Sequence, residues 1–422
     1  MTSLKEMTIA DPDTIKDPYD YYQRLRNEDP VHFDEKLGAW LVTKHKDIVA
    51  VARDTVIYSD EMRVAASVRS PYQDEADEYI KSKGFYLLDP SDSFKVDGEL
   101  HKRRRGLIAH AFTAHAVAAM ADQVAKICQD QFDSFAADGV VDLVKDYAIP
   151  VPIKVICDSL GLPLDRIEEV RRAADSMVAR AGSGATRDEA FQHADNIMLL
   201  QQFARDAIEQ RLKEPTNDLI SQVVNSSAEA PQGEELTEQE LMSIISVSIA
   251  GGVDTTRNTI AYALYTLATR PELLKRLQQS ENQDKEIAAL CEETLRYYSP
   301  VPALPRVVTE DTVLDGKKLA KDSLVFLCWA SGNRDPDKFE NPDEFNIDRK
   351  GSSQHLAFGV GVHMCIGAML ARNEIKASLK QFINRVESCE LDIPESDLDY
   401  SDSLVILRGL KSLPVRLKLK AL

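Results

Sequence analysis

Residues 355–372 read His355-Leu-Ala-Phe-Gly-Val-Gly-Val-His-Met-Cys-Ile-Gly-Ala-Met-Leu-Ala-Arg372. Three glycines, Gly359, Gly361 and Gly367, surround Cys365. Glycines permit backbone conformations that other residues rarely adopt, and they allow backbone N–H groups to approach the sulfur. The residues after Gly367 have helical composition, which predicts that Cys365 lies at a helix N-terminus, where the macrodipole favours an anion. The stretch therefore predicts a thiolate.

A cysteine in this position has several interpretations. A single cysteine in such a chain is often only a small buried apolar residue. A zinc site needs four ligands, whereas His355, His363 and Cys365 supply three, and the chain has no Cys-x-x-Cys partner. The glycines also lack the spacing of a dinucleotide-binding loop. A metal held by a single thiolate is left, and this points to haem.

The stretch resembles the cysteine loop of cytochromes P450, in particular those of the soluble bacterial type. The resemblance rests on Phe358-Gly-x-Gly-x-His-x-Cys365-x-Gly367 followed by Leu370-Ala-Arg372, and it extends over roughly residues 17–417. It implies a mainly α-helical fold with small β-sheets in one large domain. It also implies haem b as the cofactor, with Cys365 as the axial ligand of the iron and with Phe358 and Gly359 in the cofactor-binding loop.

Composition sets bounds on the class of protein. The chain has 422 residues without a Gly/Ser- or Pro-rich linker, which predicts a single domain over residues 1–422. A formal net charge of -18 argues against general binding to nucleic acid or to anionic membranes. Six scattered cysteines fit a reducing cytoplasm, and neither a signal peptide nor an apolar membrane span is present. We expect a soluble, monomeric, cytoplasmic protein.

The first hundred residues predict local elements around an irregular segment. Residues 1–16 are expected to be flexible, residues 17–26 to form a helix, and residues 31–33 and 39–43 to form two strands. Residues 58–96 lack a regular pattern, as do functional lids and disordered loops. The resemblance places this segment over a substrate pocket, so we expect a mobile lid there, with Leu87 and Leu88 facing the substrate.

A basic helix is expected to begin at His101. His101 and Arg105 lie four residues apart on one helical face, so they can bind the same anion. Lys102, Arg103 and Arg104 predict a solvated basic face, which together with Arg372 is expected to receive a redox partner. The resemblance implies that the haem propionates are bound by His101, Arg105, Arg306 and His363, with His355 as a further candidate.

A long helix is predicted over residues 237–270. It begins at the capping box Thr237-Glu-Gln-Glu240, ends before Pro271, and carries Ala250-Gly-Gly-Val-Asp-Thr-Thr256 near its middle. Two adjacent glycines cost about 1 kcal/mol each in a helix, and either close helix packing or a local widening of the helix would explain them. The resemblance implies that Asp254 and Thr255 relay protons for oxygen activation and that Val247, Ala250 and Gly251 line the substrate pocket.

Glu293 and Arg296 lie three residues apart on a further predicted helix. Taken alone, such a pair is usually a weak surface contact. The resemblance makes these two residues and Arg349 a buried ionic triad that supports the haem pocket. Strands are predicted at residues 312–316 and 323–329. The resemblance also places three residues at the distal side of the pocket: Val301, Ala303 and Leu304.

The resemblance implies a haem-thiolate monooxygenase. It would insert one atom of O2 into a C–H or C=C bond of a small apolar substrate, by hydroxylation, epoxidation or O-dealkylation. The sequence carries no flavin or iron–sulfur motif, so electrons are expected from a ferredoxin and an NAD(P)H-dependent ferredoxin reductase. Two alternatives stay open: a peroxide-driven peroxygenase of the same fold, and a non-catalytic haem protein that senses a gas. The sequence does not identify the substrate.

Overall fold

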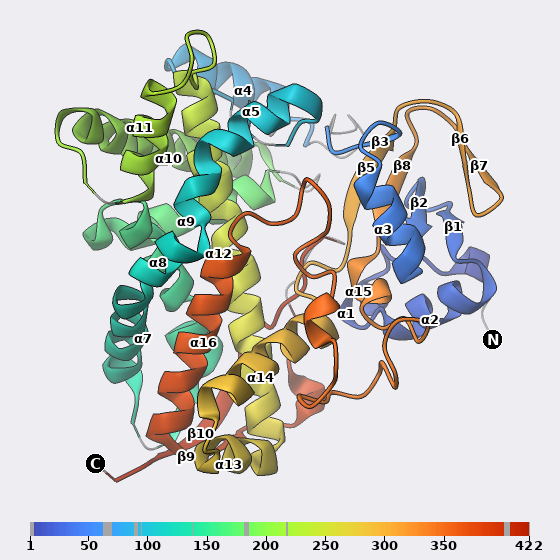
Figure 1. Cartoon of the computed structure of the whole chain (residues 1–422), viewed down its shortest axis with the longest axis vertical. Coiled ribbons are helices and arrows are strands. Elements are labelled where there is room, and N and C mark those ends of the chain that lie inside the picture. The colour runs from blue at the N-terminus through green and yellow to red at the C-terminus, as the bar shows by residue number, and fades with distance from the viewer. Residues whose placement is uncertain are drawn as a thin grey trace. The chain divides into compact units, whose positions relative to one another are not determined.

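A computed structural model describes residues 4–61, 70–87, 92–93, 95–137, 139–180, 185–216, 218–400 and 406–421. The chain forms two compact units (Figure 1). The first unit comprises Met1–Asp60, Ala121–Val151 and Thr255–Leu422, and the second comprises Glu61–Met120 and Pro152–Asp254. Neither unit is a continuous stretch of the sequence, because the chain passes between them several times.

The first unit contains a five-stranded sheet with the order β1-β2-β8-β5-β3. Strands β2 and β8 are parallel, and the other neighbours are antiparallel. The hairpin predicted near residues 31–43 is confirmed, with Val31 opposite Val42 and Gly38 at a positive φ in the turn. The strands are β1 (Val31–Asp34), β2 (Ala39–Val42), β3 (Tyr58–Ser59), β5 (Leu304–Val308) and β8 (Leu324–Leu327).

Two smaller sheets belong to the same unit. One is the hairpin β6 (Thr312–Leu314) and β7 (Lys317–Leu319), the first strand of which the sequence predicted. The other has the order β4-β10-β9 and consists of β4 (Gly139–Asp142), β9 (Val386–Leu391) and β10 (Pro414–Leu419). The sequence analysis did not identify the strands of this second sheet, because their short apolar runs do not stand out from neighbouring helical patterns.

The first unit also contains several helices. Helix α16 packs along α7, where the rings of Phe132 and Phe382 lie 6.4 Å apart, and Tyr147 joins them from the π-helical turn Val144–Ala148. The helices are α1 (Pro12–Lys16), α2 (Tyr19–Glu28), α3 (His45–Arg53), α7 (Ala121–Phe135), α13 (Pro271–Gln279), α14 (Gln283–Tyr298), α15 (Trp329–Gly332) and α16 (Ala368–Arg385).

Within the described residues of the second unit, the regular secondary structure is helical. Ala76 and Ile80 of α4 pack against Ala190, Ala194 and Met198 of α10. Its helices are α4 (Gln73–Ser82), α5 (Gly98–Ala109), α6 (Ala114–Ala119), most of α8 (Pro150–Ser159), α9 (Ile167–Ala179), α10 (Arg187–Lys213) and α11 (Leu219–Ala228). None of the described helices in either unit is both long and apolar enough to cross a lipid bilayer.

The long helix α12 (Glu238–Thr269) contributes residues to both units. Its start is fixed by the predicted capping box: the Glu240 N–H donates to Thr237 Oγ1 at 3.2 Å, and the Thr237 N–H donates to Glu240 Oε2 at 2.8 Å. Its end precedes Arg270 and Pro271, where a new helix begins. The helix is one residue shorter at each end than the sequence predicts.

Two expectations for the N-terminal quarter need correction. Within residues 1–16, Ile9 is buried, and Asp34 accepts hydrogen bonds from the Thr8 hydroxyl and the Ile9 N–H, so this part is anchored rather than flexible. Within the expected lid, residues 73–82 form α4, whose buried Ala76 and Ile80 are one helical turn apart. The many acidic residues of α4 obscured its short apolar stripe. Residues 62–69, 88–91 and 94 of the expected lid lie outside the described residues.

Candidate functional site

The cysteine loop is a closed turn ahead of α16. The Cys365 N–H donates to the Phe358 carbonyl at 2.8 Å, and the Gly359 N–H donates to the Leu356 carbonyl at 2.8 Å. Gly361 has a φ of +84°, and a Cβ there would lie 3.1 Å from the Ala52 carbonyl oxygen, so both conformation and space favour glycine. The sequence correctly identified a loop that depends on glycine.

One detail of the loop differs from expectation. Gly367 has a φ of -81°, which any residue adopts, so the expected unusual conformation at this position is wrong. A Cβ at Gly367 would instead lie 4.0 Å from Cys365 Sγ, an ordinary contact. Helix α16 begins at Ala368, directly after Gly367 as the sequence predicts, and Cys365 lies just before it.

Cys365 is the exposed member of the six cysteines. The other five are buried. Burial raises the pKa of Cys128, Cys157, Cys291 and Cys389 to about 12, so these side chains remain neutral thiols at physiological pH. The thiolate chemistry expected from the sequence is therefore available at Cys365 and not at the buried positions.

A half-buried carboxylate, Glu292, braces the cysteine loop against α14. Glu292 accepts two hydrogen bonds from Arg372, at 2.6 and 3.0 Å, and the Arg372 guanidinium lies 4.4 Å from the Phe358 ring centroid. His355 Nε2 faces the same carboxylate at 3.3 Å. Burial alone would raise the pKa of Glu292, but the contacts with His355 and Arg372 lower it to about 2. Glu292 is therefore an anion that ties the two ends of the loop to one helix.

His355 does not have the geometry expected of a propionate ligand. Its Nδ1 accepts the Ala357 N–H at 3.1 Å, which requires Nδ1 to be unprotonated and places the proton on Nε2, toward Glu292. Burial lowers the pKa of His355, in agreement with this neutral form. Both ring nitrogens thus face protein atoms. His355 braces the loop, and the expectation that it binds a propionate is not supported.

Arg306 and His363, by contrast, meet at one carboxylate. Arg306 Nη1 donates to Asp60 Oδ1 at 2.5 Å, and His363 Nδ1 lies 3.4 Å from Asp60 Oδ2. All three side chains are at most 5% exposed. Arg306 and His363, two of the residues that the resemblance assigns to haem propionates, therefore both contact a carboxyl group in this structure.

The basic residues at positions 101–105 of α5 lie in different environments. His101 is buried and Arg105 is half-buried, and they remain four residues apart on the helix as expected. Arg103 and Arg104 both bind Glu240, and the side chain of Arg104 is 7% exposed. The expected basic docking face is therefore wrong for these two arginines, and also for Arg372, because each is already paired with a carboxylate. Lys102 alone is exposed, at 78%.

Helix α12 is continuous through residues 250–256. A Cβ at Gly251 would meet open space, and one at Gly252 would lie 3.8 Å from Ile156, an ordinary contact. Close helix packing therefore does not require the two glycines, and the helix shows no break at them. Asp254 is 6% exposed, and the carbonyl oxygen of Thr255, which is half-buried, accepts the Thr259 hydroxyl at 2.9 Å.

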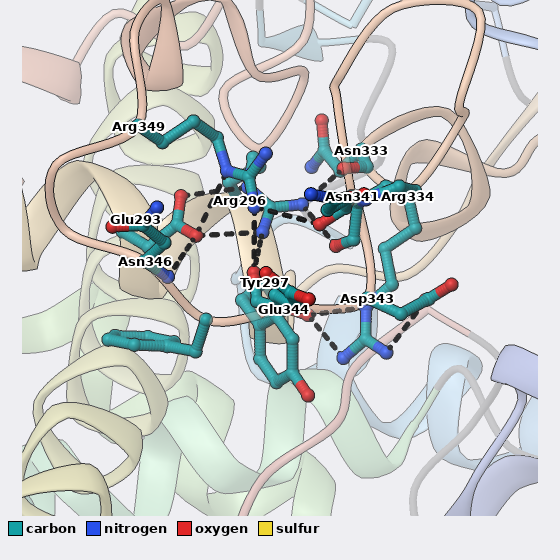
Figure 2. Close-up of polar contacts among 12 residues, drawn as sticks. Glu293, Arg296, Tyr297, Asn333, Arg334, Asn341, Asp343, Glu344, Asn346 and Arg349 are labelled. Carbon is teal, nitrogen blue, oxygen red and sulfur yellow. Dashed lines mark hydrogen bonds and ion pairs between the residues drawn. The ribbon is translucent and has the colours of Figure 1, made fainter.

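The structure brings Glu293, Arg296 and Arg349 into one buried network (Figure 2). Arg296 donates to both oxygens of Glu293 at 2.8 Å, and Arg349 Nε lies 3.2 Å from Glu293 Oε1. The side chains of Glu293 and Arg296 are fully buried. The remaining donors of Arg296 bind the carbonyls of Asn333, Pro342 and Glu344. The network ties α14 to the irregular segment 333–349.

The expected pocket residues fall into different environments. Val247 and Ala250 of α12 are half-buried, as are Val301 and Leu304, and Gly251 is exposed. Ala303 is fully buried in a hydrophobic cluster with Tyr21 and Leu25, so the structure places it in the core rather than at a pocket wall. Leu87 packs at the edge of the cluster between α4 and α10, and Leu88 lies outside the described residues.

Sequence reasoning missed two residues of the site. Asp60 follows the two-residue strand β3, and nothing in its neighbourhood distinguishes it from a loop aspartate. Glu292 stands beside Glu293, and the Glu-x-x-Arg pattern singled out Glu293 alone. A search for charged partners four residues away on α14 would not have revealed Glu292, because its partners Arg372 and His355 are distant in sequence.

The donor set fits haem b. Arg306 is 3% exposed, and its Nε has no hydrogen-bond partner within the described residues, although Nη1 is engaged by Asp60. Such a buried donor leaves the guanidinium able to bind a further acceptor, as a propionate requires. An exposed cysteine in a closed glycine loop supplies the thiolate. These features define a haem-thiolate protein.

Comparisons with known proteins agree with this class. The model of the family described as Cytochrome P450 matches residues 55–413. Cytochrome P450 109 of Bacillus spizizenii is 31% identical over 406 residues, which cover 96% of this chain and 92% of that protein. Mycinamicin IV hydroxylase/epoxidase of Micromonospora griseorubida is 32% identical over 388 residues, which cover 89% of each. The chain belongs to the cytochrome P450 family.

A solved structure supports the same assignment. CYP109E1 from Bacillus megaterium, in complex with corticosterone, matches with a TM-score of 0.81 at 28% identity and covers 96% of this chain and 99% of that chain. The predicted fold class, a mainly helical cytochrome P450 fold with small sheets in one large domain, is confirmed. So are the enzyme class, a P450 monooxygenase, and the cofactor, haem b.

Proposed function

We propose that this P450 monooxygenase hydroxylates or epoxidises a small apolar organic substrate with O2, and that Cys365 is the axial ligand of its haem. The single observation that carries the assignment is the exposed Cys365, held in a closed glycine loop while the other five cysteines are buried and neutral. When bound, haem b supplies the redox-active iron that binds and activates O2. The protein residues anchor it and manage protons.

Anchoring falls to residues on several elements. Arg306 and His363 bind the haem carboxylates, supported by their convergence on a carboxylate in this structure. His101 and Arg105 are proposed for the same role because of their spacing on α5. Glu293, Arg296 and Arg349 hold the irregular segment behind the cysteine loop, and Glu292 orients Arg372 and Phe358 beside Cys365.

Proton delivery is assigned to Asp254 and Thr255. Asp254 passes a proton to Thr255 Oγ1 as this hydroxyl donates its own proton toward the reaction site, and Asp254 is then reprotonated from solvent. The open space beside Gly251 supports this assignment, because it leaves room for water next to the helix at the turn before Asp254. Val247, Ala250, Val301 and Leu304 are proposed to contact the substrate through their half-buried side chains.

The electron donor and substrate are proposed from chemistry and from relatives. The sequence carries no motif for a flavin or an iron–sulfur cluster, so a ferredoxin and an NAD(P)H-dependent reductase are proposed as donors. One relative is named a hydroxylase/epoxidase and a solved relative holds a steroid, both of which support an apolar substrate; O-dealkylation of such a molecule is a further possible reaction. The six cysteines, scattered without paired spacing, support a reducing cytoplasm.

The thiolate assignment is tested by spectroscopy. The reduced protein with carbon monoxide should show the strongly red-shifted Soret band that a thiolate opposite the gas produces. Cys365→Ser should lose this band, whereas Cys157→Ser, a change at a buried cysteine, should retain it. Wild-type protein that takes up haem without the red-shifted band would refute the assignment of Cys365.

Thr255→Ala separates the proposed enzyme from its two alternatives. A monooxygenase that depends on this hydroxyl should still consume NAD(P)H with its redox partners but should release more hydrogen peroxide and less oxidised product. If the protein is a peroxygenase, Thr255→Ala should turn over with added peroxide as fast as wild type does. If the protein is a gas sensor, Thr255→Ala should bind carbon monoxide with the wild-type affinity. Neither the variant nor wild type should then form product.

A further inference from the structure

A buried carboxylate, Asp60, lies among the residues assigned to the haem propionates. Its side chain is 3% exposed, and it contacts Arg306 at 2.5 Å and His363 at 3.4 Å. Burying a carboxylate is costly unless a cation and hydrogen bonds compensate for lost solvation. A second carboxylate is therefore unexpected where the site must also accept the carboxylates of haem, and its presence needs an explanation.

The five-stranded sheet fixes the position of Asp60. Strands β3 and β5 are antiparallel, with Tyr58 opposite Val308 and Ser59 opposite Val307. Continuing this register by one residue sets Asp60 opposite Arg306, so the two are a cross-strand pair of opposite charge. The pairing is thus built into the sheet and does not depend on a flexible side chain reaching across a loop.

Asp60 engages only one corner of the Arg306 guanidinium. Arg306 Nη1 donates to Asp60 Oδ1 and also, at 2.8 Å, to the Pro305 carbonyl. The Nε atom is buried and has no hydrogen-bond partner within the described part of the chain. Because Nε and Nη2 share one edge of the planar group, the contacts at Nη1 leave that edge for a second carboxylate, which it can bind with two parallel hydrogen bonds.

We propose that Asp60 is a positioning residue of the haem-carboxylate site. By holding Nη1, it fixes the rotation of the Arg306 guanidinium so that the Nε edge is presented to a propionate, and it holds the His363 ring beside the same point. This inference rests on the proposed function, because it takes Arg306 and His363 as propionate ligands. It assigns no contact between Asp60 and haem itself.

Asp60→Asn tests the inference, since asparagine keeps the size of the side chain but not its charge. Transfer of haem from the purified holoprotein to excess apomyoglobin should become about tenfold faster or more, because the charge-assisted hydrogen bond that orients Arg306 is weakened. Asp60→Glu, which restores the charge, should recover part of the difference. The red-shifted band of the reduced carbon monoxide complex should persist, because Cys365 is unaffected.

Haem dimethyl ester distinguishes positioning from a general loss of stability. When both propionates are esterified, Arg306 and His363 lose their charged ligand, so Asp60→Asn and wild type should release the ester at the same rate. As a control, Asp218→Asn removes the charge from another acid–arginine pair, that of the half-buried Asp218 with the buried Arg211 at 2.6 Å, and should leave the release of ordinary haem unchanged.

The outcomes separate the inference from the proposed function. If wild type takes up no haem, both fail. If wild type binds haem but Asp60→Asn releases it at the wild-type rate, the positioning role alone is refuted. Slower release would also refute it, because Asp60 would then be a competitor of the propionate. A difference that persists with the dimethyl ester would show a purely structural effect and would likewise overturn the proposal.

Discussion

Glu374, in α16, is a buried carboxyl group whose Oε2 has no hydrogen-bond partner within the described residues. Burial raises its pKa well above the usual value of 4.5. Asp60 and Glu293, which are also buried, differ in having guanidinium partners. Burial therefore favours the neutral form of Glu374 in the folded protein, whereas Asp60 and Glu293 each face a guanidinium group.

The raised pKa of Glu374 predicts a pH dependence of stability. The folded state holds the proton to higher pH than the unfolded state, so above pH 4.5 unfolding releases a proton and stability falls as the pH rises. For one group the slope is at most about 1.4 kcal/mol per pH unit. Glu374→Gln should abolish this contribution in urea unfolding between pH 5 and pH 8.

The control for this measurement is an exposed acid. Glu281 is exposed at the start of the turn before α14, so Glu281→Gln should leave the pH dependence as in wild type. If Glu374→Gln and wild type lose stability in parallel as the pH rises, Glu374 is ionised in the folded protein and the prediction is wrong.

Among the elements, α14 carries the densest set of structural ion pairs. Its adjacent acids point to different segments: Glu292 binds Arg372 and faces His355 at the cysteine loop, and Glu293 binds Arg296 and Arg349 (Figure 2). The helix thus holds the loop with one residue and the irregular segment 333–349 with the next. Removal of one partner in a buried network leaves the others as uncompensated charges.

Glu293→Gln should therefore destabilise the protein strongly. The expected loss is about 3–5 kcal/mol in the free energy of unfolding, because Arg296 is fully buried and Arg349 is nearly so. Urea unfolding followed by far-UV circular dichroism would measure it. Arg276→Gln, which removes a largely solvated arginine from Glu286 and Asp348, should cost less than about 1 kcal/mol. Similar losses for the two variants would contradict the prediction.

The whole molecule combines a strongly acidic chain with a buried arginine, Arg306, for which we propose a role in haem binding. The net charge is -18, yet Arg306 is buried with one donor unused by the described protein groups. The charges of the predicted docking face are largely paired within the chain, so the overall charge rather than a basic patch governs encounters with other macromolecules. Haem that binds at an internal site also stabilises the folded state.

Removal of haem should lower Tm, because a ligand that binds only the folded state stabilises it by mass action. At a free haem concentration about 1,000 times Kd the stabilisation is about 4 kcal/mol. Adding haem to the apoprotein should raise Tm in a concentration-dependent manner, as measured by circular dichroism. The rise should be much smaller for Cys365→Ser but unchanged for Cys157→Ser, even though the latter has a lower starting Tm. Equal rises for wild type and Cys365→Ser would exclude Cys365 as a ligand.

Short-range patterns account for what was predicted correctly. The capping box at Thr237 and the stop at Pro271 bound α12, and the turn at Gly38 joins β1 to β2, because these signals act through neighbouring residues. The cysteine loop is equally local, since Phe358, Gly361 and Cys365 lie within eight positions of one another. Helix α4 escaped notice because its acidic surface leaves only a narrow apolar stripe.

The sequence by itself determined the family, the glycine loop around Cys365 and the ends of helix α12 to within one residue, because each is encoded in a run of adjacent positions. Only the tertiary structure decided which charges meet. Arg103 and Arg104, which the sequence placed on a docking face, both bind Glu240. His355 faces Glu292, and Asp60 binds Arg306. The reason is physical: a side chain's partner depends on which distant backbone segments pack beside it, and the electrostatic energy of a buried charge depends on that partner.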